Sequence, residues 1–195
     1  MLYTHLDHGD PVPPEEATMG NRGAGTPTWG WRRANPFKDR FELRMGGRVL
    51  ATLMLEGIAI TSADVNVDGH RFTLSVEGVG SQRIKICNTA EGSVVVATLD
   101  RHWSGRGGTL RLAQGGRLEW RRVGWWRPLW EFADRFGNPL VRLRPDGSVV
   151  DCVLGDELAG LAEPWSDVLL LLALAWFLLV IGGHAVPPRL EPAIL

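Results

Sequence analysis

The longest apolar run of the chain lies close to its C-terminus. Fourteen consecutive residues, Val168 to Ile181, carry no polar side chain. We predict a helix from about Asp167 to Ile181, because Ser166 and Asp167 are good N-cap residues and Gly182-Gly183 suits a left-handed stop. Such a helix is roughly 22 Å long, against roughly 30 Å of bilayer hydrocarbon. The length favours a buried core helix, and a tilted membrane anchor stays open as the alternative.

Upstream of this run, from Trp29 onward, apolar and polar residues alternate with a period of two. Residues 40–45 show the pattern most clearly, and Gly46-Gly47 predicts a two-residue hairpin turn into a strand at 48–55. A Gly-rich loop is expected at 104–108. Further strands are expected at 71–76, 83–87, 94–99, 109–113, 117–123, 129–133, 140–144 and 148–154. Turn signals at roughly ten-residue intervals therefore predict an antiparallel meander of about 10 to 12 strands.

The meander and the helix predict one architecture together. Sequential hairpins favour a closed barrel over a sandwich, and a barrel of ten to twelve strands leaves a lumen that something must fill. Tilted strands of eight to ten residues give a barrel roughly 20 to 25 Å tall, which matches the helix. We therefore expect a mainly β protein, an antiparallel closed barrel around the C-terminal helix. The inward lining should include Phe41, Leu43, Phe72, Leu74, Ile84 and Ile86.

The chain divides into three parts. Residues 1–30 are rich in Gly, Pro and acids and are expected to form a flexible leader, in which Met19 is an alternative start. Residues 31–183 form the expected barrel with its helix at about 167–181, and 184–195 form a tail. His5, Asp7, His8 and Asp10 resemble a metal tract but are interpreted as a solvated segment. The N-terminus has no secretory signal, so a cytoplasmic location is expected.

Composition narrows the classes of function. The net charge of the 195 residues is −1, which argues against nucleic-acid binding, yet residues 100–145 hold ten arginines against four acids. Cys87 and Cys152 form no CxxC motif, which excludes zinc ribbons and thioredoxin motifs. The sequence contains no phosphate loop, HExxH or GxSxG motif. We expect no enzyme, no cofactor and no metal site.

Two short patterns pair an Asp with a His two residues later. They are Asp68-Gly69-His70 and Asp100-Arg101-His102, and on an extended strand the two side chains of each pair would share a face. No nucleophile accompanies either pair. Both lie at expected turns, so we interpret each Asp as a turn former and each His as a surface residue.

Residues 120–130, with the sequence WRRVGWWRPLW, combine arginine and tryptophan most densely. Tryptophan is favoured at lipid headgroups and arginine pairs with phosphate, so Arg121, Trp125, Trp126 and Arg127 are candidates for binding a lipid headgroup. The interpretation that we favour is that the aromatic side chains serve core and rim packing. Leu118, Trp120, Trp130 and Phe132 are expected to face the core, with Arg121 pointing to solvent.

The chain resembles the tubby-like fold shared by the tubby C-terminal domain, phospholipid scramblases and LURP-one-related plant proteins. The resemblance covers roughly 31–183 and rests on repeated strand, glycine turn, strand units (FELRMGGRVLATL, IKICNTAEGSVVVATL, WEFADRFGNPLVRL) and on DVLLLLALAWFLLVI. It implies a twelve-stranded barrel around a hydrophobic helix. Tubby proteins bind phosphoinositide headgroups through basic residues, and scramblases are associated with lipids and calcium. This chain has two lysines and no calcium-loop spacing, so neither ligand site transfers residue by residue.

These observations predict a non-enzymatic, tubby-like binding or scaffold module that recognises anionic phospholipid. It is expected to be monomeric, cytoplasmic and membrane-associated, with a protein partner that the sequence does not identify. The alternative is a tail-anchored membrane protein whose cytosolic β-domain recruits a protein partner. In that case residues 168–181 would enter the bilayer instead of the barrel.

Overall fold

A computed structural model describes residues 29–35, 38–57, 60–78, 83–90, 92–102, 107–126, 128–152 and 164–185. These residues form twelve strands followed by one helix. The elements are β1 (Trp29–Asn35), β2 (Lys38–Met45), β3 (Arg48–Glu56), β4 (Ser62–Val67), β5 (His70–Glu77), β6 (Arg83–Asn88), β7 (Val94–Arg101), β8 (Gly107–Leu112), β9 (Arg117–Val123), β10 (Leu129–Ala133), β11 (Pro139–Leu143), β12 (Val149–Cys152) and α1 (Pro164–Ile181). The predicted mainly β chain with one C-terminal helix is confirmed.

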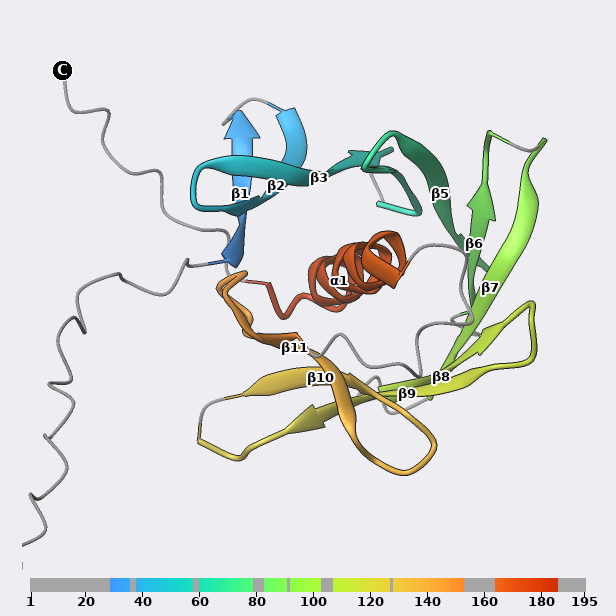
Figure 1. Ribbon diagram of the computed structural model, residues 1–195, viewed down its shortest axis with the longest axis vertical. Coiled ribbons are helices and arrows are strands. Elements are labelled where there is room, and N and C mark those ends of the chain that lie inside the picture. Colours follow the sequence, from blue (N-terminus) through green and yellow to red (C-terminus); the bar gives the residue numbers. More distant parts are fainter. Residues whose placement is uncertain are drawn as a thin grey trace, which may run out of the picture.

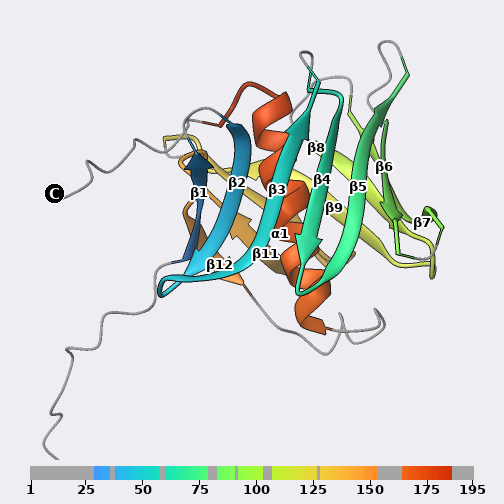
Figure 2. The same cartoon turned by 90° about the horizontal axis from the view of Figure 1, so that it is seen from above.

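All twelve strands belong to one antiparallel sheet, in which each strand pairs with its neighbour in sequence. This order confirms the meander that the hairpin signals predicted. Figures 1 and 2 show strands on several sides of α1, so that the helix lies against the inner face of the sheet. Because consecutive strands run in opposite directions, successive connections alternate between the two ends of the sheet.

The turn between β2 and β3 follows the sequence prediction. Gly46 and Gly47 have φ values of 54° and 87°, a left-handed conformation that favours glycine, and Met45 pairs with Arg48 across the turn.

The glycines at 107 and 108 do not follow the sequence prediction. They were expected in a loop at 104–108, but they form the start of β8.

The physical reason for this correction is the close approach of neighbouring backbones. A Cβ atom at Gly107 would lie 2.7 Å from the carbonyl oxygen of Trp120, and one at Gly108 would lie 2.8 Å from that of Asp100. Glycine at these two positions therefore allows three strands to come together. The sequence pattern alone does not separate this use of glycine from a loop.

The helix begins earlier than predicted and ends where predicted. α1 starts at Pro164, whose fixed φ suits the first helical position, and not at about Asp167. At the other end Gly183 has a φ of 66°, and the His184 amide donates to the Leu179 carbonyl over 2.8 Å. This is the Schellman type of helix ending. The sheet begins at Trp29, slightly before the predicted boundary at residue 31.

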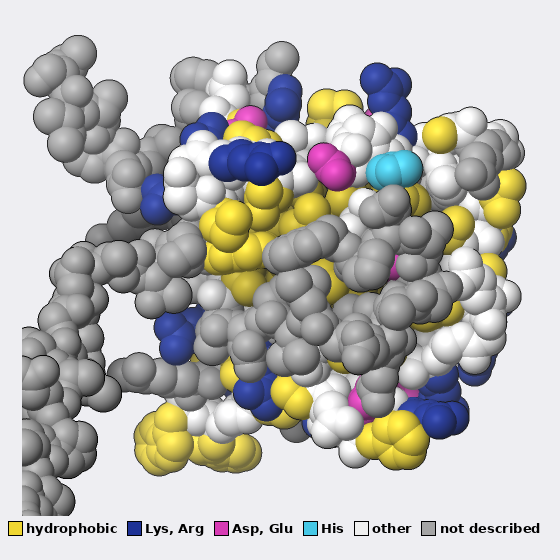
Figure 3. Space-filling model, viewed as in Figure 1, with side chains coloured by type: hydrophobic (Ala, Val, Ile, Leu, Met, Phe, Trp, Pro, Cys, Tyr) yellow, Lys and Arg dark blue, Asp and Glu magenta, His cyan; other side chains and the backbone are white. Residues whose placement is uncertain are grey.

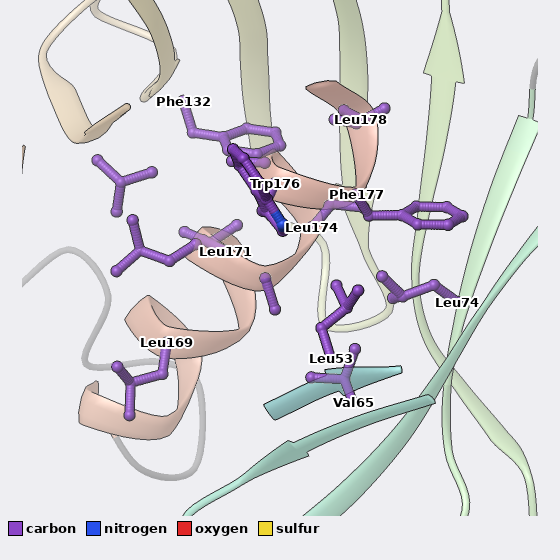
Figure 4. Close-up of a cluster of buried hydrophobic side chains, with 14 of the residues drawn as sticks. Leu53, Val65, Leu74, Phe132, Leu169, Leu171, Leu174, Trp176, Phe177 and Leu178 are labelled. Carbon is purple, nitrogen blue, oxygen red and sulfur yellow. The ribbon is translucent and has the colours of Figure 1, made fainter. Parts of the chain in front are cut away.

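The core lies between the helix and the inner face of the sheet. All six predicted lining residues are buried, and so is nearly every residue of α1 from Val168 to Leu179. Trp176 illustrates the packing, because its ring centroid lies 6.3 Å from that of Trp31 and 5.6 Å from that of Phe41. Figure 4 shows further leucines of α1 among strand residues. Apolar side chains on every side of α1 are thus buried.

Within the described residues, no helix combines the length and the apolarity required of a membrane span. The expected leader up to residue 28, including the His5 to Asp10 tract, lies outside the described residues, and so does the tail from residue 186.

Leu172, whose side chain is fully buried in α1, provides a test of this packing. We expect Leu172→Ala to lower the free energy of unfolding by about 2–5 kcal/mol, the usual cost of truncating a buried leucine. Leu172→Arg should prevent folding, because an unpaired buried charge costs several kcal/mol. Urea unfolding followed by circular dichroism measures both effects. Leu170→Ala, at a half-buried position of the same helix, is the control and should cost less; equal costs at both positions would contradict the packing.

Candidate functional site

The connection between β9 and β10 carries the two most exposed tryptophans of the described residues. Trp125 is 86% exposed and Trp126 is 91% exposed. Figure 3 shows hydrophobic atoms projecting from the periphery near the position of this hairpin in Figure 1. Arg127, the third candidate of this connection, lies outside the described residues. Large apolar rings that project singly or in pairs from a connection are available to a partner or to a lipid surface.

Arg121, the fourth candidate, is held by an intramolecular network. Its Nε donates to Glu131 Oε1 over 2.8 Å and its Nη2 donates to the Gly137 carbonyl over 3.1 Å. The second oxygen of Glu131 accepts from Arg142 Nε over 2.9 Å. Glu131 is only 1% exposed, because the two guanidinium groups cover it. Arg121 therefore stabilises the outer face of the sheet, and it shares the negative charge of Glu131 with Arg142.

The other aromatic residues of the segment pack in the core, as expected. Trp120 and Trp130 stack with ring centroids 5.1 Å apart, and the Trp120 ring lies 4.8 Å from that of Phe132. Trp130 also contacts His184, which follows the end of α1, with ring centroids 5.0 Å apart. The stack therefore connects the interior to the end of the sheet where α1 stops.

Two arginines missed by the sequence analysis face this same end. Alternation along β7 places Arg101 on the face of the buried Ala97 and Leu99. Arg122 on β9 pairs directly with Trp130 on β10. Residues directly opposite each other in a ladder share a face, so Arg122 lies on the face that bears Trp130. The signal that could have found both arginines is strand parity, because each continues an inward apolar series.

No carboxylate among the described residues lies within ion-pair distance of Arg101 or Arg122. Arginines on the outer face differ: Arg111 contacts Asp100 at 2.6 Å and Arg117 contacts Glu119 at 2.7 Å. Burial lowers the pKa of Arg101. We refer to Arg101, Arg122, Trp130 and His184 as the basic cluster.

The electrostatics of the basic cluster favour an anion. Burial lowers the pKa of His184, and the positive charges of Arg122 and Arg101 lower it further. The C-terminus of α1 contributes a partial negative charge of about half an elementary charge to this end. Its last turn contains no basic residue. Two guanidinium charges exceed that partial charge, so the cluster retains net positive charge.

The two Asp and His patterns form no catalytic pair. Asp68 occupies the β4–β5 turn with a φ of 49°, and His70 is exposed, as the turn interpretation predicted. Asp100 is not in a turn but within β7, where it accepts from Arg83 over 2.8 Å and from Arg111 over 2.6 Å. The bond to Asp100 raises the pKa of Arg83. Neither pattern competes with the basic cluster as a candidate site. The chemistry available at the basic cluster is anion binding by its arginines, beside the rings of Trp130 and His184.

Comparison with models of protein families, with curated proteins and with solved structures finds no match.

The assignment of Arg121 to the outer network predicts a structural phenotype. Arg121→Gln should lower the free energy of unfolding by about 1–3 kcal/mol, because it removes charge-assisted bonds to a buried carboxylate. Arg111→Gln removes an exposed ion pair and should cost less than about 1 kcal/mol. Urea unfolding of both variants measures the difference. Equal stability of the two variants would contradict the network's role.

The position of His184 predicts its titration. We expect an NMR titration to give a pKa below the ordinary value of about 6.5, and Arg122→Gln to raise it. Because the unfolded chain then binds this proton more tightly, stability is lost as the pH falls from about 6.5 to the lower folded-state pKa. Arg48→Gln, at the start of β3 and at the other end of the sheet, should leave the titration unchanged. If Arg122→Gln left the pKa of His184 unchanged, the two side chains would not interact, and the basic cluster would be contradicted.

Proposed function

We propose that this protein is a non-enzymatic binding module that docks onto anionic phospholipid through the β9–β10 hairpin and the basic cluster. The observation that carries the proposal is the exposure of Trp125 and Trp126 on the hairpin that also carries Arg122. Apolar rings and unbalanced positive charge thus lie at one end of the sheet. An anionic bilayer surface offers the complementary combination, phosphate groups above an apolar layer.

We further propose that the sheet closes into a tubby-like barrel around α1. Two contacts between its first strand and the β11–β12 connection support closure. Gly30 forms an isolated antiparallel bridge with Ser148, and the Trp31 amide donates to the Gly147 carbonyl over 2.9 Å. A closed barrel has no free edge strands and encloses its contents. Closure would fix both ends of the lumen, and with them the position of the basic cluster.

The packing of α1 supports this proposal over the tail-anchored alternative. If α1 entered a bilayer, the inner face of the sheet would lose its cover, including Leu43, Leu74 and Ile84, which are fully buried. An exposed apolar surface of that extent is unfavourable in water. A module that keeps α1 inside would instead reach the membrane reversibly, from the cytoplasm, as a monomer.

Each group of the site has a separate role in the proposed docking. Trp125 and Trp126 would insert at the headgroup level, where tryptophan is favoured. Arg101 and Arg122 would attract the anionic surface, each by about 1 kcal/mol when close to it. The attraction should fade with salt, because the Debye length is about 10 Å at 0.1 M.

Flotation with phosphatidylcholine vesicles that contain phosphatidylserine or a phosphoinositide tests the proposal. Binding is expected at low salt and should be absent with phosphatidylcholine alone. We expect the double variant Trp125→Ala, Trp126→Ala to weaken binding about tenfold or more, and Arg101→Gln and Arg122→Gln to weaken it about fivefold each. Flotation that fails at low salt with every anionic lipid would refute the lipid proposal.

Matched controls come from the opposite end of the sheet. Phe136, 68% exposed between β10 and β11, gives an aromatic control as Phe136→Ala, and Arg48→Gln removes one charge there. Neither change should alter flotation. A soluble inositol phosphate separates the two parts of the site: the double tryptophan variant should still bind it, whereas Arg122→Gln should not. Equal loss for control and site variants would show only an effect of net charge or of exposed surface.

A further inference from the structure

The first half of α1 borders a cavity of about 370 Å³ on the side of strands β5 to β8. Pockets for small molecules commonly have volumes of about 300–1,000 Å³, so this one falls within the usual range. We refer to it as the β5–β8 cavity. Its apolar lining includes Phe72, Ile86, Ala97 and Leu110 from the sheet and Leu171 and Leu174 from the helix.

The cavity follows from the position of α1 within the sheet. The helix lies nearest to β3, β4, β10 and β11. If the sheet closes as proposed above, twelve strands surround more space than one helix fills, which would leave the wall of β5 to β8 less closely covered. Towards the end of α1, Phe177 extends to the side of Leu74 (Figure 4). In the first half of the helix, shorter leucine side chains and Ala97 leave the space open.

Polar groups surround the cavity where α1 begins. They are His70, Asn88, Gln114, Ser166 and Asp167. Ser166 is only 8% exposed and lines the cavity at the start of α1. A hydroxyl can both donate and accept a hydrogen bond, so Ser166 offers a polar contact to a ligand there.

The charge of the lining selects the ligand. No Lys or Arg is among the described residues that line the cavity, whereas Asp167 is. A carboxylate would therefore meet no positive partner among these described lining residues. A hydroxyl or ester can bond Ser166 without any charge to neutralise.

We propose that the β5–β8 cavity binds a neutral single-chain amphiphile, a long-chain alcohol or monoacylglycerol. The aliphatic chain lies along Leu171 and Leu174, and the polar group bonds to Ser166. The site does not depend on the proposed docking to lipid surfaces, because the cavity and the basic cluster lie at opposite ends of α1.

Methyl NMR of the full-length protein titrated with 1-decanol tests the proposal. The methyl resonances of Ala97 and Leu174 should shift saturably, whereas those of Leu53 and Leu143, on the far side of the helix, should not. Decanoate should bind at least tenfold more weakly than decanol. Absence of saturable shifts at Ala97 and Leu174, shifts of equal size on both sides of α1, or equal binding of decanoate would overturn the proposal.

Ala97→Leu fills the cavity from β7 and should weaken decanol binding at least tenfold. Thr98→Leu adds a similar side chain next to it, at a half-buried position on the opposite face of the strand, and should leave binding unchanged. Both variants should float with anionic vesicles as the unmodified protein does, which separates this site from the proposed lipid surface. Decanol binding that survives unchanged in a folded Ala97→Leu protein would place the ligand elsewhere.

Gln114→Arg gives a second test that does not depend on core packing, because residue 114 is exposed. A new guanidinium beside the cavity should strengthen decanoate binding about tenfold, through a charge-assisted hydrogen bond. Decanol affinity should change little. An unchanged affinity for decanoate would contradict a headgroup position near residue 114.

Discussion

A helix with apolar side chains on every face cannot be stable in water unless other apolar surface surrounds it, and this requirement organises the whole molecule. The described sheet supplies that surface through the alternation of inward apolar and outward polar residues along most of its strands. Residues such as Leu43, Leu74 and Phe132 cover the helix, and their neighbours in sequence face outward. Removing the helix would expose the inner face, and removing the sheet would expose the helix. Each therefore depends on the other for its burial.

Because the middle of α1 is buried among apolar side chains, polar residues lie only at the two ends of this helix. Residues 172–179 of α1 are buried and carry apolar side chains. The polar residues Ser166 and Asp167 lie at the start of the helix, and His184 lies just past its end. The two ends differ in charge. One combines His184 with two inward-facing arginines, and the other has no Lys or Arg among the described residues that line its cavity. A net charge of −1 conceals this asymmetry, because the total says nothing about position.

The outer face explains why arginine content is a poor guide to function here. Several arginines of the second half form ion pairs on this face. Arg111 contacts Asp100 across strands, Arg121 shares Glu131 with Arg142 across strands, and Arg117 contacts Glu119 two residues along β9. Such pairs stabilise the sheet modestly. Arg101 and Arg122, which strand parity turns inward, have no described carboxylate within ion-pair distance.

The sequence by itself predicted most of the strands, the hairpin turns and the helix, since each depends on local periodicity and on glycine at positive φ, but β4 was not among the predicted strands. It also placed Trp125 and Trp126 in a connection between strands, where large rings have no strand face on which to pack. Only the tertiary structure decided which arginines meet a carboxylate. Arg121 and Arg122 are adjacent in sequence, yet one meets Glu131 across the sheet and the other lies opposite Trp130. The tertiary structure also decided on which side α1 leaves a cavity, since that depends on the register of distant strands and on the packing of side chains against the helix.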